Sequence, residues 1–516
     1  MAGSVVQAAF VVVLTILICS ETILAYPWQK AYVLRQANYW WTRQYLLMGE
    51  RQEAFGGNLI LNPIETKANE ILMTAKTQEI NDGFVKGNSF LPSRNFLEVM
   101  PEIEKSEVFK ILRDLPKGGV LHVHDSAMVS LDYKLNNLTY RDNLYVCDEN
   151  DTFVMKFFDT PNDQCNWQLL RDLRQNPDRA KAINEKIAQK MTMVVKNPNS
   201  VYETVNDAWR KFDSIFAFMN TWMAYPPVRK DHFYQGLQEL YDDNVMYVEV
   251  RSGLSKMYDL NGTMYGPVEV ARLYKEVSDR FLNDHPDFIG VKIIYAPSRF
   301  VENVDNYLKT MIELNKLYPD FVVGFDLVGQ EDKGTPLIKF VDTLNTVNPD
   351  IQFFFHAGET NWDGEPTDMN IIDAVLLRSK RIGHGYALTK HPYFWDLMNQ
   401  FEIAVEVCPI SNQVLALVKD LRNHPATTLF ATGSPVVISN DDPGLWNAKG
   451  LTHDFYEAFM ALMSASSDLG SLKQLAMNSF IYSSLNNTEK QNALTRWQDK
   501  WDAFVDKLAQ SNNGEM

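Results

Sequence analysis

The chain has little positive charge. Its 49 Lys and Arg residues are outnumbered by 65 Asp and Glu residues, which gives a formal net charge of −16 and an isoelectric point near 5.1. This balance leaves no basic stripe to neutralise phosphates, so it argues against nucleic acid or an anionic membrane surface as a partner. A small neutral or cationic ligand is expected instead.

Long apolar runs are missing after the first residues. The amino-terminal run AAFVVVLTILICSETILA ends in small residues after a polar break, which is typical of a secretory signal peptide. We expect residues 1–25 to be removed and the protein to be secreted, with a retained signal anchor as the alternative. No later segment is long and apolar enough to predict a membrane span.

Cysteine is also scarce, with four residues in the chain. Cys19 belongs to the signal peptide, and Cys408 lies in an apolar strand, where we expect it to stay reduced and buried. Cys147 and Cys165 flank a short polar loop and are expected to form a disulfide in an oxidising compartment. Sequons for N-glycosylation begin at Asn137, Asn150, Asn261 and Asn486.

From Gly119 onward, short β-rich runs alternate with helical stretches. Such alternation predicts parallel strands joined by helical crossovers. Eight units over roughly 350 residues predict an α/β fold, the (β/α)₈ TIM barrel, whose active sites collect where the strands end. The eight runs end at His124, Arg251, Tyr295, Leu327, Ala357, His384, Cys408 and Asp441.

Two stretches lie outside this repeat. Residues 26–106 precede the first barrel strand, which we place within 107–126, and they show apolar residues at helical spacing behind Pro63. Residues 127–204 are longer than an ordinary βα loop and contain the cysteine pair, so we expect an inserted subdomain. Residues 205–510 complete the barrel.

The amino-terminal helical segment is rich in aromatic residues that a complete barrel does not need. Trp28, Trp40 and Trp41 are examples. Aromatic surface left over in this way marks an interface. We therefore expect a homodimer with two-fold symmetry. The alternative is that these helices wrap their own barrel.

Histidines and acids stand at several of the expected strand ends. His122 and His124 are two residues apart on one strand and so project to the same side. With His356 and Asp441 they make a nitrogen and oxygen set that suits Zn²⁺ and leaves a position for water, whose pKa zinc lowers. For an isolated HxH pair, two hydrogen-bonded core histidines would be the alternative.

Two metal-binding features are absent from the sequence, and their absence limits the kind of metal site that we expect. The fourth strand, FVVGFDL, ends without a lysine that could bridge a second metal, so we expect one zinc per chain. The chain also has no PCxxC pair, which excludes a zinc site built on a pair of cysteine thiolates.

Six motifs, PKGGVLHVHD, GFDLVGQED, FFHAGET, RIGHGYAL, EVCPISN and ISNDDP, occur in this order. Together they resemble the adenosine deaminase family, and more closely its secreted branch, the adenosine deaminase-related growth factors. The similarity runs from about Trp28 to Leu508 and implies a metal-dependent hydrolase barrel. It also implies a homodimer held by the amino-terminal segment, and an insert that binds receptors or glycans.

The resemblance assigns the reaction to particular side chains. It implies that His122, His124, His356 and Asp441 bind zinc, with Asp441 also counted among the catalytic groups. Glu359 would donate a proton to purine N1. A carboxylic acid at that atom stabilises the charge that develops as water adds to C6, provided that burial keeps it protonated. His384 would position the attacking water and take part in its deprotonation.

The resemblance also implies four substrate contacts. The backbone N–H of Gly329 would bind purine N3, and Asp442 would pair with N7. Asp125 and Trp209 would contact the nucleoside. For Trp209, which lies in AWRKFDSIF at helical spacing, a plain core position is the alternative reading.

The expected activity is hydrolytic deamination of extracellular adenosine or 2′-deoxyadenosine. One alternative is a growth factor that signals by receptor binding and keeps its barrel for stability. Another is a different barrel amidohydrolase, such as an adenine or AMP deaminase. The absence of a cationic cluster near the expected mouth argues against a phosphorylated substrate.

Overall fold

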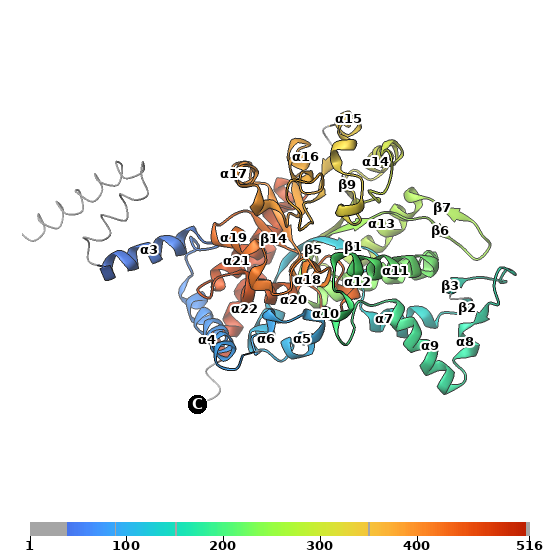
Figure 1. Ribbon diagram of the computed structural model, residues 1–516, viewed down its shortest axis with the longest axis horizontal. Helices are drawn as coiled ribbons and strands as arrows, with labels where there is room; N and C mark the ends of the chain where they lie inside the picture. Colours follow the sequence, from blue (N-terminus) through green and yellow to red (C-terminus); the bar gives the residue numbers. More distant parts are fainter. Residues whose placement is uncertain (1–38, 88, 150–151, 349–350, 512–516) are drawn as a thin grey trace, which may run out of the picture. The chain divides into compact units, whose positions relative to one another are not determined.

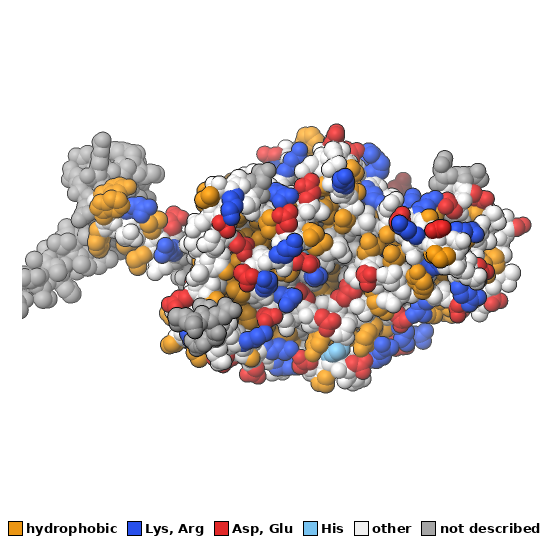
Figure 2. Space-filling view, turned by 90° about the horizontal axis from the view of Figure 1, so that it is seen from below, with side chains coloured by type: hydrophobic (Ala, Val, Ile, Leu, Met, Phe, Trp, Pro, Cys, Tyr) orange, Lys and Arg blue, Asp and Glu red, His pale blue; other side chains and the backbone are white. Residues whose placement is uncertain are grey.

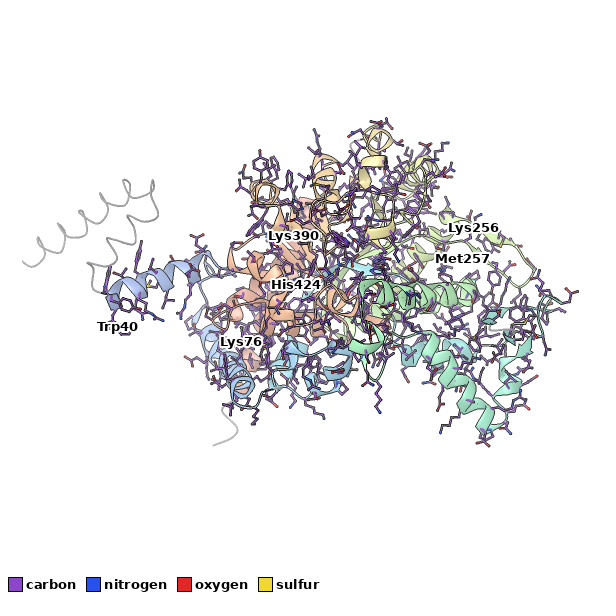
Figure 3. All side chains as sticks on the ribbon, in the orientation of Figure 1. Trp40, Lys76, Lys256, Met257, Lys390 and His424 are labelled. Atoms are coloured by element: carbon purple, nitrogen blue, oxygen red, sulfur yellow. A yellow bond between two sulfur atoms is a disulfide. The ribbon has the colours of Figure 1, made fainter. Side chains whose placement is uncertain are left out.

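The computed structural model describes residues 39–87, 89–149, 152–348 and 351–511. The chain divides into two compact units, Met1–Ala54 and Phe55–Met516. In the first unit, helix α3 (Tyr39–Glu53) buries none of its residues, and Trp40, labelled in Figure 3, is 69% exposed. The proposed signal peptide, with Cys19, and Trp28 lie outside the described residues.

The second unit contains two sheets of parallel strands that are surrounded by helices (Figure 1). The first sheet has the order β1 (Gly118–His124), β5 (Val245–Ser252), β8 (Gly290–Tyr295), β9 (Val322–Phe325) and β10 (Gln352–Phe353). The second has the order β11 (His356–Ala357), β12 (Arg381–His384), β13 (Ala404–Val407) and β14 (Val436–Ile438).

Backbone hydrogen bonds close the barrel next to the expected metal ligands. The N–H of His124 donates to the carbonyl of Asp441 at 2.9 Å, and the N–H of Asp441 donates to the carbonyl of His122 at 3.1 Å. The last strand therefore returns to the first, and the predicted (β/α)₈ barrel is confirmed. The fifth predicted strand forms two separate strands. Its first part, β10, pairs with β9, and its second part, β11, pairs with β12.

Helices surround the strands and bury their apolar faces against them. The crossovers include α11 (Val205–Met223), α12 (Pro226–Asp242), α13 (Pro267–Asp284), α14 (Asp305–Leu317), α15 (Val341–Leu344), α16 (Asn370–Leu376), α17 (Pro392–Gln400), α18 (Pro409–Val414), α19 (Ala426–Ala431), α20 (Thr452–Glu457), α21 (Leu469–Ile481) and α22 (Asn487–Gln510). Helix α11 begins at Thr204, whose side chain forms a capping box with Asp207. Its buried face includes Trp209.

Three helices between Phe55 and the first strand pack on the barrel. They are α4 (Pro63–Val85), α5 (Phe96–Ile103) and α6 (Glu107–Asp114). Helix α4 opens at Asn62, as the proline predicts, and its buried Glu65 accepts hydrogen bonds from Lys473 at 2.6 Å and from Trp501 at 2.8 Å. The predicted amino-terminal segment is thus divided. Its later helices wrap their own barrel, and the described surplus of aromatic surface lies on α3.

The insert after β1 forms a small antiparallel sheet with flanking helices (Figure 1). Its elements are α7 (Leu131–Asn136), β2 (Leu144–Glu149), β3 (Thr152–Phe157), β4 (Gln168–Leu169), α8 (Leu170–Leu173), α9 (Pro177–Lys190) and α10 (Pro198–Val201). A disulfide joins Cys147 on β2 to Cys165, whereas Cys408 is buried and unpaired. The sequon residues Asn137, Asn261 and Asn486 are exposed, and Asn150 lies outside the described residues.

The surface of the described residues is mixed in charge. Figure 2 shows acidic and basic side chains interspersed over one face. Within the described ranges, no helix has both the length and the apolar character that a membrane span requires.

Candidate active site and metal centre

Four side chains that the sequence singles out come together where the barrel strands end. Donor atoms of His122, His124, His356 and Asp441 all lie within 4.8 Å of one another. Oδ1 of Asp441 is 3.3 Å from Nε2 of His122 and 3.1 Å from Nε2 of His124. Ligands around a tetrahedral zinc with bonds of about 2.0–2.1 Å are separated by about 3.3 Å, so this spacing suits the ion.

The electronic state of the cluster also suits a metal. Nε2 of His122 and Oδ1 of Asp441 are buried without a hydrogen-bond partner among the described residues. Burial lowers the pKa of His356 to about 4, which keeps its imidazole neutral and able to coordinate. Burial alone would raise the pKa of Asp441, but the close imidazoles of His122 and His124 outweigh it and hold that pKa well below its usual value. The donor set therefore fits Zn²⁺.

Buried carboxylates orient two of the histidines. Nδ1 of His122 lies 2.8 Å from Glu406, and Nδ1 of His356 lies 2.6 Å from Asp326. Both carboxylates also accept from Arg251, at 2.6 Å and 2.8 Å respectively. Carboxylates behind metal-binding histidines fix the ring and its tautomer, leaving the other nitrogen for the metal.

Sequence reasoning missed these three residues. Asp326 lies near the end of the fourth predicted strand, FVVGFDL, where a second metal would require a bridging lysine. Glu406 lies inside the apolar run EIAVEVC. The sequence feature that indicates such residues is a charge within a run expected to be a buried strand, because a buried charge needs a partner.

Glu359 and His384 lie beside the four-residue cluster. Oε1 of Glu359 is 3.7 Å from Nδ1 of His384, and Nε2 of His384 is 3.8 Å from Oδ2 of Asp441. Burial, together with the charges of Asp441 and Glu331, raises the pKa of Glu359 well above its ordinary value. Burial lowers the pKa of His384 well below its ordinary value. These directions favour the protonated carboxyl of Glu359 and the neutral imidazole of His384.

Backbone strain accompanies these positions. His384 has φ of 60° and Asp441 has φ of 56°, which are left-handed values for residues that carry a Cβ. Nδ2 of Asn412 lies 3.1 Å from Nδ1 of His384 and helps to hold its ring. Strained conformations of this kind persist where the surrounding packing enforces them, and they cluster at functional sites.

The remaining sequence-predicted residues line one cavity of about 550 Å³, whose wall also includes His124, His356, Glu359, His384 and Asp441. Asp125, Trp209, Gly329 and Asp442 are all part of its wall. Oδ2 of Asp125 accepts hydrogen bonds from Ser252 at 2.6 Å and Tyr274 at 2.7 Å. Gly329 has φ of +110°, a conformation that favours glycine. Burial and the charge of Asp441 raise the pKa of Asp442 well above its usual value.

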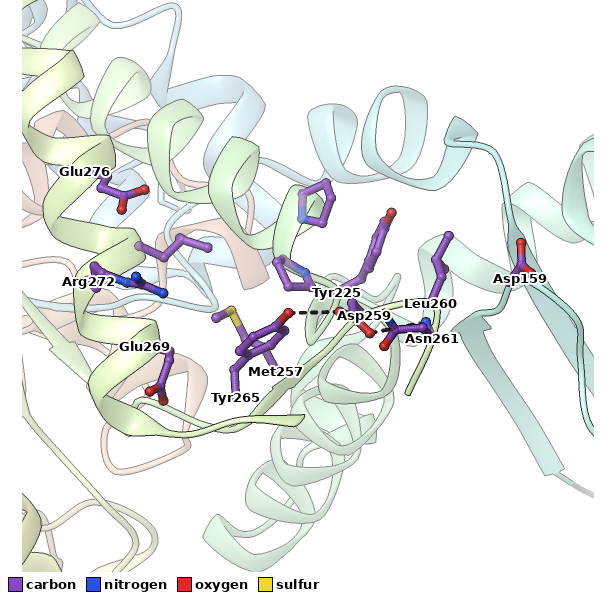
Figure 4. A pocket seen from close by; sticks show the side chains of 13 residues that line it. Asp159, Tyr225, Met257, Asp259, Leu260, Asn261, Tyr265, Glu269, Arg272 and Glu276 are labelled. Carbon is purple, nitrogen blue, oxygen red and sulfur yellow. Dashed lines mark hydrogen bonds between the residues drawn. The ribbon is translucent and has the colours of Figure 1, made fainter. Parts of the chain in front are cut away.

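A second cavity, of about 620 Å³, is lined by different residues (Figure 4). It lies between the start of α12, the hairpin of β6 (Met257–Tyr258) and β7 (Met264–Tyr265), one face of α13, and Asp159 of the insert. The hydroxyl of Tyr265 donates to Asp259 at 2.9 Å. Among the described residues that line it there is no histidine and no cysteine.

A (β/α)₈ barrel with three histidines, an aspartate and a buried carboxyl at its strand ends has the make-up of a metal-dependent hydrolase. Residues 179–500 match the family model for adenosine deaminase, and residues 14–112 match the model for the adenosine/AMP deaminase N-terminal region. The chain belongs to the adenosine deaminase family. The resemblance carried by the six sequence motifs is thereby confirmed.

Relatives match nearly the whole chain. An adenosine deaminase of Lutzomyia longipalpis is 42% identical over 503 residues, which cover 96% of this chain and 98% of that protein. Adenosine deaminase 2 of Homo sapiens is 41% identical over 479 residues, covering 91% of this chain and 93% of that protein.

Solved structures with little sequence identity share the fold. An Arabidopsis N6-mAMP deaminase has a TM-score of 0.56 at 17% identity, over 76% of this chain and 99% of its own. A zinc-containing amidohydrolase of Burkholderia ambifaria has a TM-score of 0.55 at 18% identity, over 78% of this chain and 95% of its own.

Proposed function

We propose that this protein is a zinc-dependent enzyme that hydrolyses adenosine and 2′-deoxyadenosine to inosine, 2′-deoxyinosine and ammonia. The observation that carries the proposal is the arrangement at the barrel mouth, where a four-residue ligand set comes together and three of its members, His124, His356 and Asp441, line the same cavity as Glu359. Relatives named adenosine deaminase, similar over nearly the full chain, support the substrate class.

The ligand set would hold one zinc ion, which when bound acts as a Lewis acid and lowers the pKa of its water. Glu359, kept protonated by its raised pKa, donates its proton to purine N1 as the water oxygen bonds to C6. His384 positions the attacking water and takes part in removing its proton. The exocyclic amine then takes up the proton that His384 removed from the water, the bond between C6 and this nitrogen breaks, and ammonia leaves while the C6 hydroxyl returns a proton to Glu359.

Residues of the cavity wall would recognise the purine. Asp442 has a raised pKa and an Oδ1 atom without a hydrogen-bond partner among the described residues, so a protonated carboxyl would donate to N7. The N–H of Gly329 would donate to N3. Asp125 and Trp209, which is 7% exposed, would contact the nucleoside.

The decisive experiment follows the ultraviolet absorbance of adenosine after purified protein is added, with and without a chelator. Deamination that a chelator abolishes and zinc restores supports the proposal, and elemental analysis should find one zinc per chain. Absence of turnover in the zinc-loaded protein would favour the receptor-binding growth factor without catalysis. Faster turnover of AMP or adenine than of adenosine would assign the barrel to another substrate.

We also propose that the enzyme is secreted. The disulfide between Cys147 and Cys165 and the exposure of Asn137, Asn261 and Asn486 are compatible with an oxidising, glycosylating route. The insert, with the second cavity that it shares with the β6–β7 hairpin, is the surface that we expect a receptor or glycan to use. Growth-factor activity would require such binding.

A homodimer is the assembly that we propose. Helix α3 exposes Tyr39, Trp40, Trp41 and Tyr45 at 65–69% each, and such an aromatic surface is typical of an interface. Because α4 packs on the barrel, deletion of residues 1–54 is the appropriate test, since it leaves that packing intact. Light scattering should report a dimer for the longer chain and a monomer for the truncated one. A truncated dimer would place the interface elsewhere.

A further inference from the structure

A buried pair of opposite charges, Arg299 and Glu331, lies behind the candidate proton donor. Glu331 begins the short helix η4 (Glu331–Lys333) and is 1% exposed, and Arg299 is fully buried. Nη1 of Arg299 donates to Oε1 of Glu331 at 3.0 Å. Neither residue is among those that line the catalytic cavity, so any effect on the reaction must pass through another residue.

Each member of the pair holds one end of the segment from His356 to Glu359. Nη2 of Arg299 donates to the backbone carbonyl of His356 at 2.9 Å. Oε2 of Glu331 accepts a hydrogen bond from the backbone N–H of Glu359. Nδ2 of Asn370 donates to the other oxygen of Glu331 at 2.7 Å, which fixes the carboxylate from a third side.

The segment needs this support because the sheet scarcely reaches it. Strand β11 contains only His356 and Ala357, and Gly358 has φ of +77°, so the backbone leaves the strand before Glu359. A buried N–H without an acceptor is costly, and Glu331 is the acceptor that the N–H of Glu359 has. Oε1 of Glu359, by contrast, has no hydrogen-bond partner among the described residues. The backbone therefore does most to set where this carboxyl lies.

We propose that Glu331, paired with Arg299, is a positioning residue that fixes the backbone of Glu359 and thereby aims its carboxyl at the substrate. This inference rests on the proposed deaminase function. It predicts a loss in kcat more than a rise in KM, because a proton donor acts in the transition state whereas the purine contacts come from other residues.

The first test is Glu331→Asp, which keeps a negative charge beside Arg299 but withdraws the carboxylate from the N–H of Glu359. Its kcat for adenosine should fall about 10- to 100-fold, the scale of a misplaced reacting group, with KM and zinc content almost unchanged. The matched control is Asp332→Glu, which keeps the charge that contributes to the raised pKa of Glu359. Asp332 accepts a hydrogen bond from Oγ1 of Thr360 at 2.6 Å, but among the described residues it has no hydrogen bond with the backbone of Glu359. The kcat of the control variant should therefore stay near the wild-type value.

A double-mutant cycle separates positioning from general stabilisation. In a Glu359→Gln background, Glu331→Asp should lower kcat by less than about twofold, because the group that Glu331 positions is already lost. An equal loss in both backgrounds, or a wild-type kcat for Glu331→Asp, overturns the proposal. Glu331→Gln enters the same cycle if the aspartate variant does not fold. A wild-type chain that does not deaminate adenosine would refute the proposed function, whereas the other failures leave that function standing.

Discussion

Replacement of Glu406 by glutamine should weaken both the fold and the metal site. The fully buried carboxylate of Glu406 accepts from Arg251 at 2.6 Å and from Arg381 at 2.7 Å, and it lies 2.8 Å from Nδ1 of His122. Glutamine preserves the shape but removes the charge, and its NH₂ group faces donors. If the amide oxygen takes the place of Oε2, His122 and Arg251 keep their acceptor without its charge, and Nε of Arg381 faces the NH₂ group.

The expected magnitude follows from what each partner retains. Breaking a buried ion pair costs about 3–5 kcal/mol. Arg251 keeps Asp326, and Arg381 keeps Glu249, so we expect the lower end of this range, about 3 kcal/mol of unfolding free energy. Loss of the carboxylate behind His122 should weaken zinc binding about 10- to 100-fold.

Two measurements separate these effects. Urea unfolding of the metal-free protein reports the fold, and competition with a chromophoric chelator reports zinc affinity. The matched control is Glu249→Gln, because Glu249 is equally buried and binds Arg381 at 2.6 Å but has no hydrogen bond with a histidine. The control should lose stability while keeping its zinc affinity. Equal zinc affinities for both variants, or an unchanged unfolding free energy for Glu406→Gln, would refute the reasoning.

Three further predictions concern other parts of the molecule. Glu359→Gln should retain zinc while kcat falls at least about 100-fold, measured by adenosine turnover, and near-normal turnover would remove Glu359 from the mechanism. Cys147→Ser should lower the unfolding free energy by about 3 kcal/mol in the chain-entropy account, and peptide mapping should find Cys147 joined to Cys165 in the parent chain. Burial lowers the pKa of Lys76 from 10.5 to about 7, so the unfolded chain binds more protons between these values. Stability relative to Lys76→Met should therefore rise with pH in that window, by at most about 1.4 kcal/mol per unit, and a flat difference would contradict it.

The sequence could predict the barrel and the placement of its polar residues because both depend on local pattern. Apolar runs at regular intervals predict the strands, and a polar residue at the end of a run is placed at the barrel mouth by topology alone. His122, His124, His356 and Asp441 are all of this kind, and the structure brings their donor atoms within 4.8 Å of one another. The strand boundaries were less predictable, because a strand ends where its backbone stops pairing with that of the neighbouring strand. The split fifth strand shows this.

The supporting residues could not be predicted in this way because their partners come from distant segments. Glu331 bonds the backbone of a residue 28 positions away, and Glu406 meets His122 across 284 positions. A buried charge in an apolar run indicates that some partner exists but does not identify it. The division of the amino-terminal segment was equally hidden, because aromatic content alone does not distinguish a helix that packs on the barrel from one that stays exposed.

Buried arginines, more than the strand ladder, hold the site together. Strands β11 to β14 have at most four residues each, so their backbone hydrogen bonds alone define the strand ends poorly. Arg251 on β5 bonds Asp326, Glu406 and the carbonyls of Leu121 and Phe354, which joins residues of several strands in one contact. Such networks contribute little net stability, because desolvation offsets the attraction, but they permit few alternative arrangements. Substitutions in these networks should therefore weaken metal binding and catalysis even where the protein still folds.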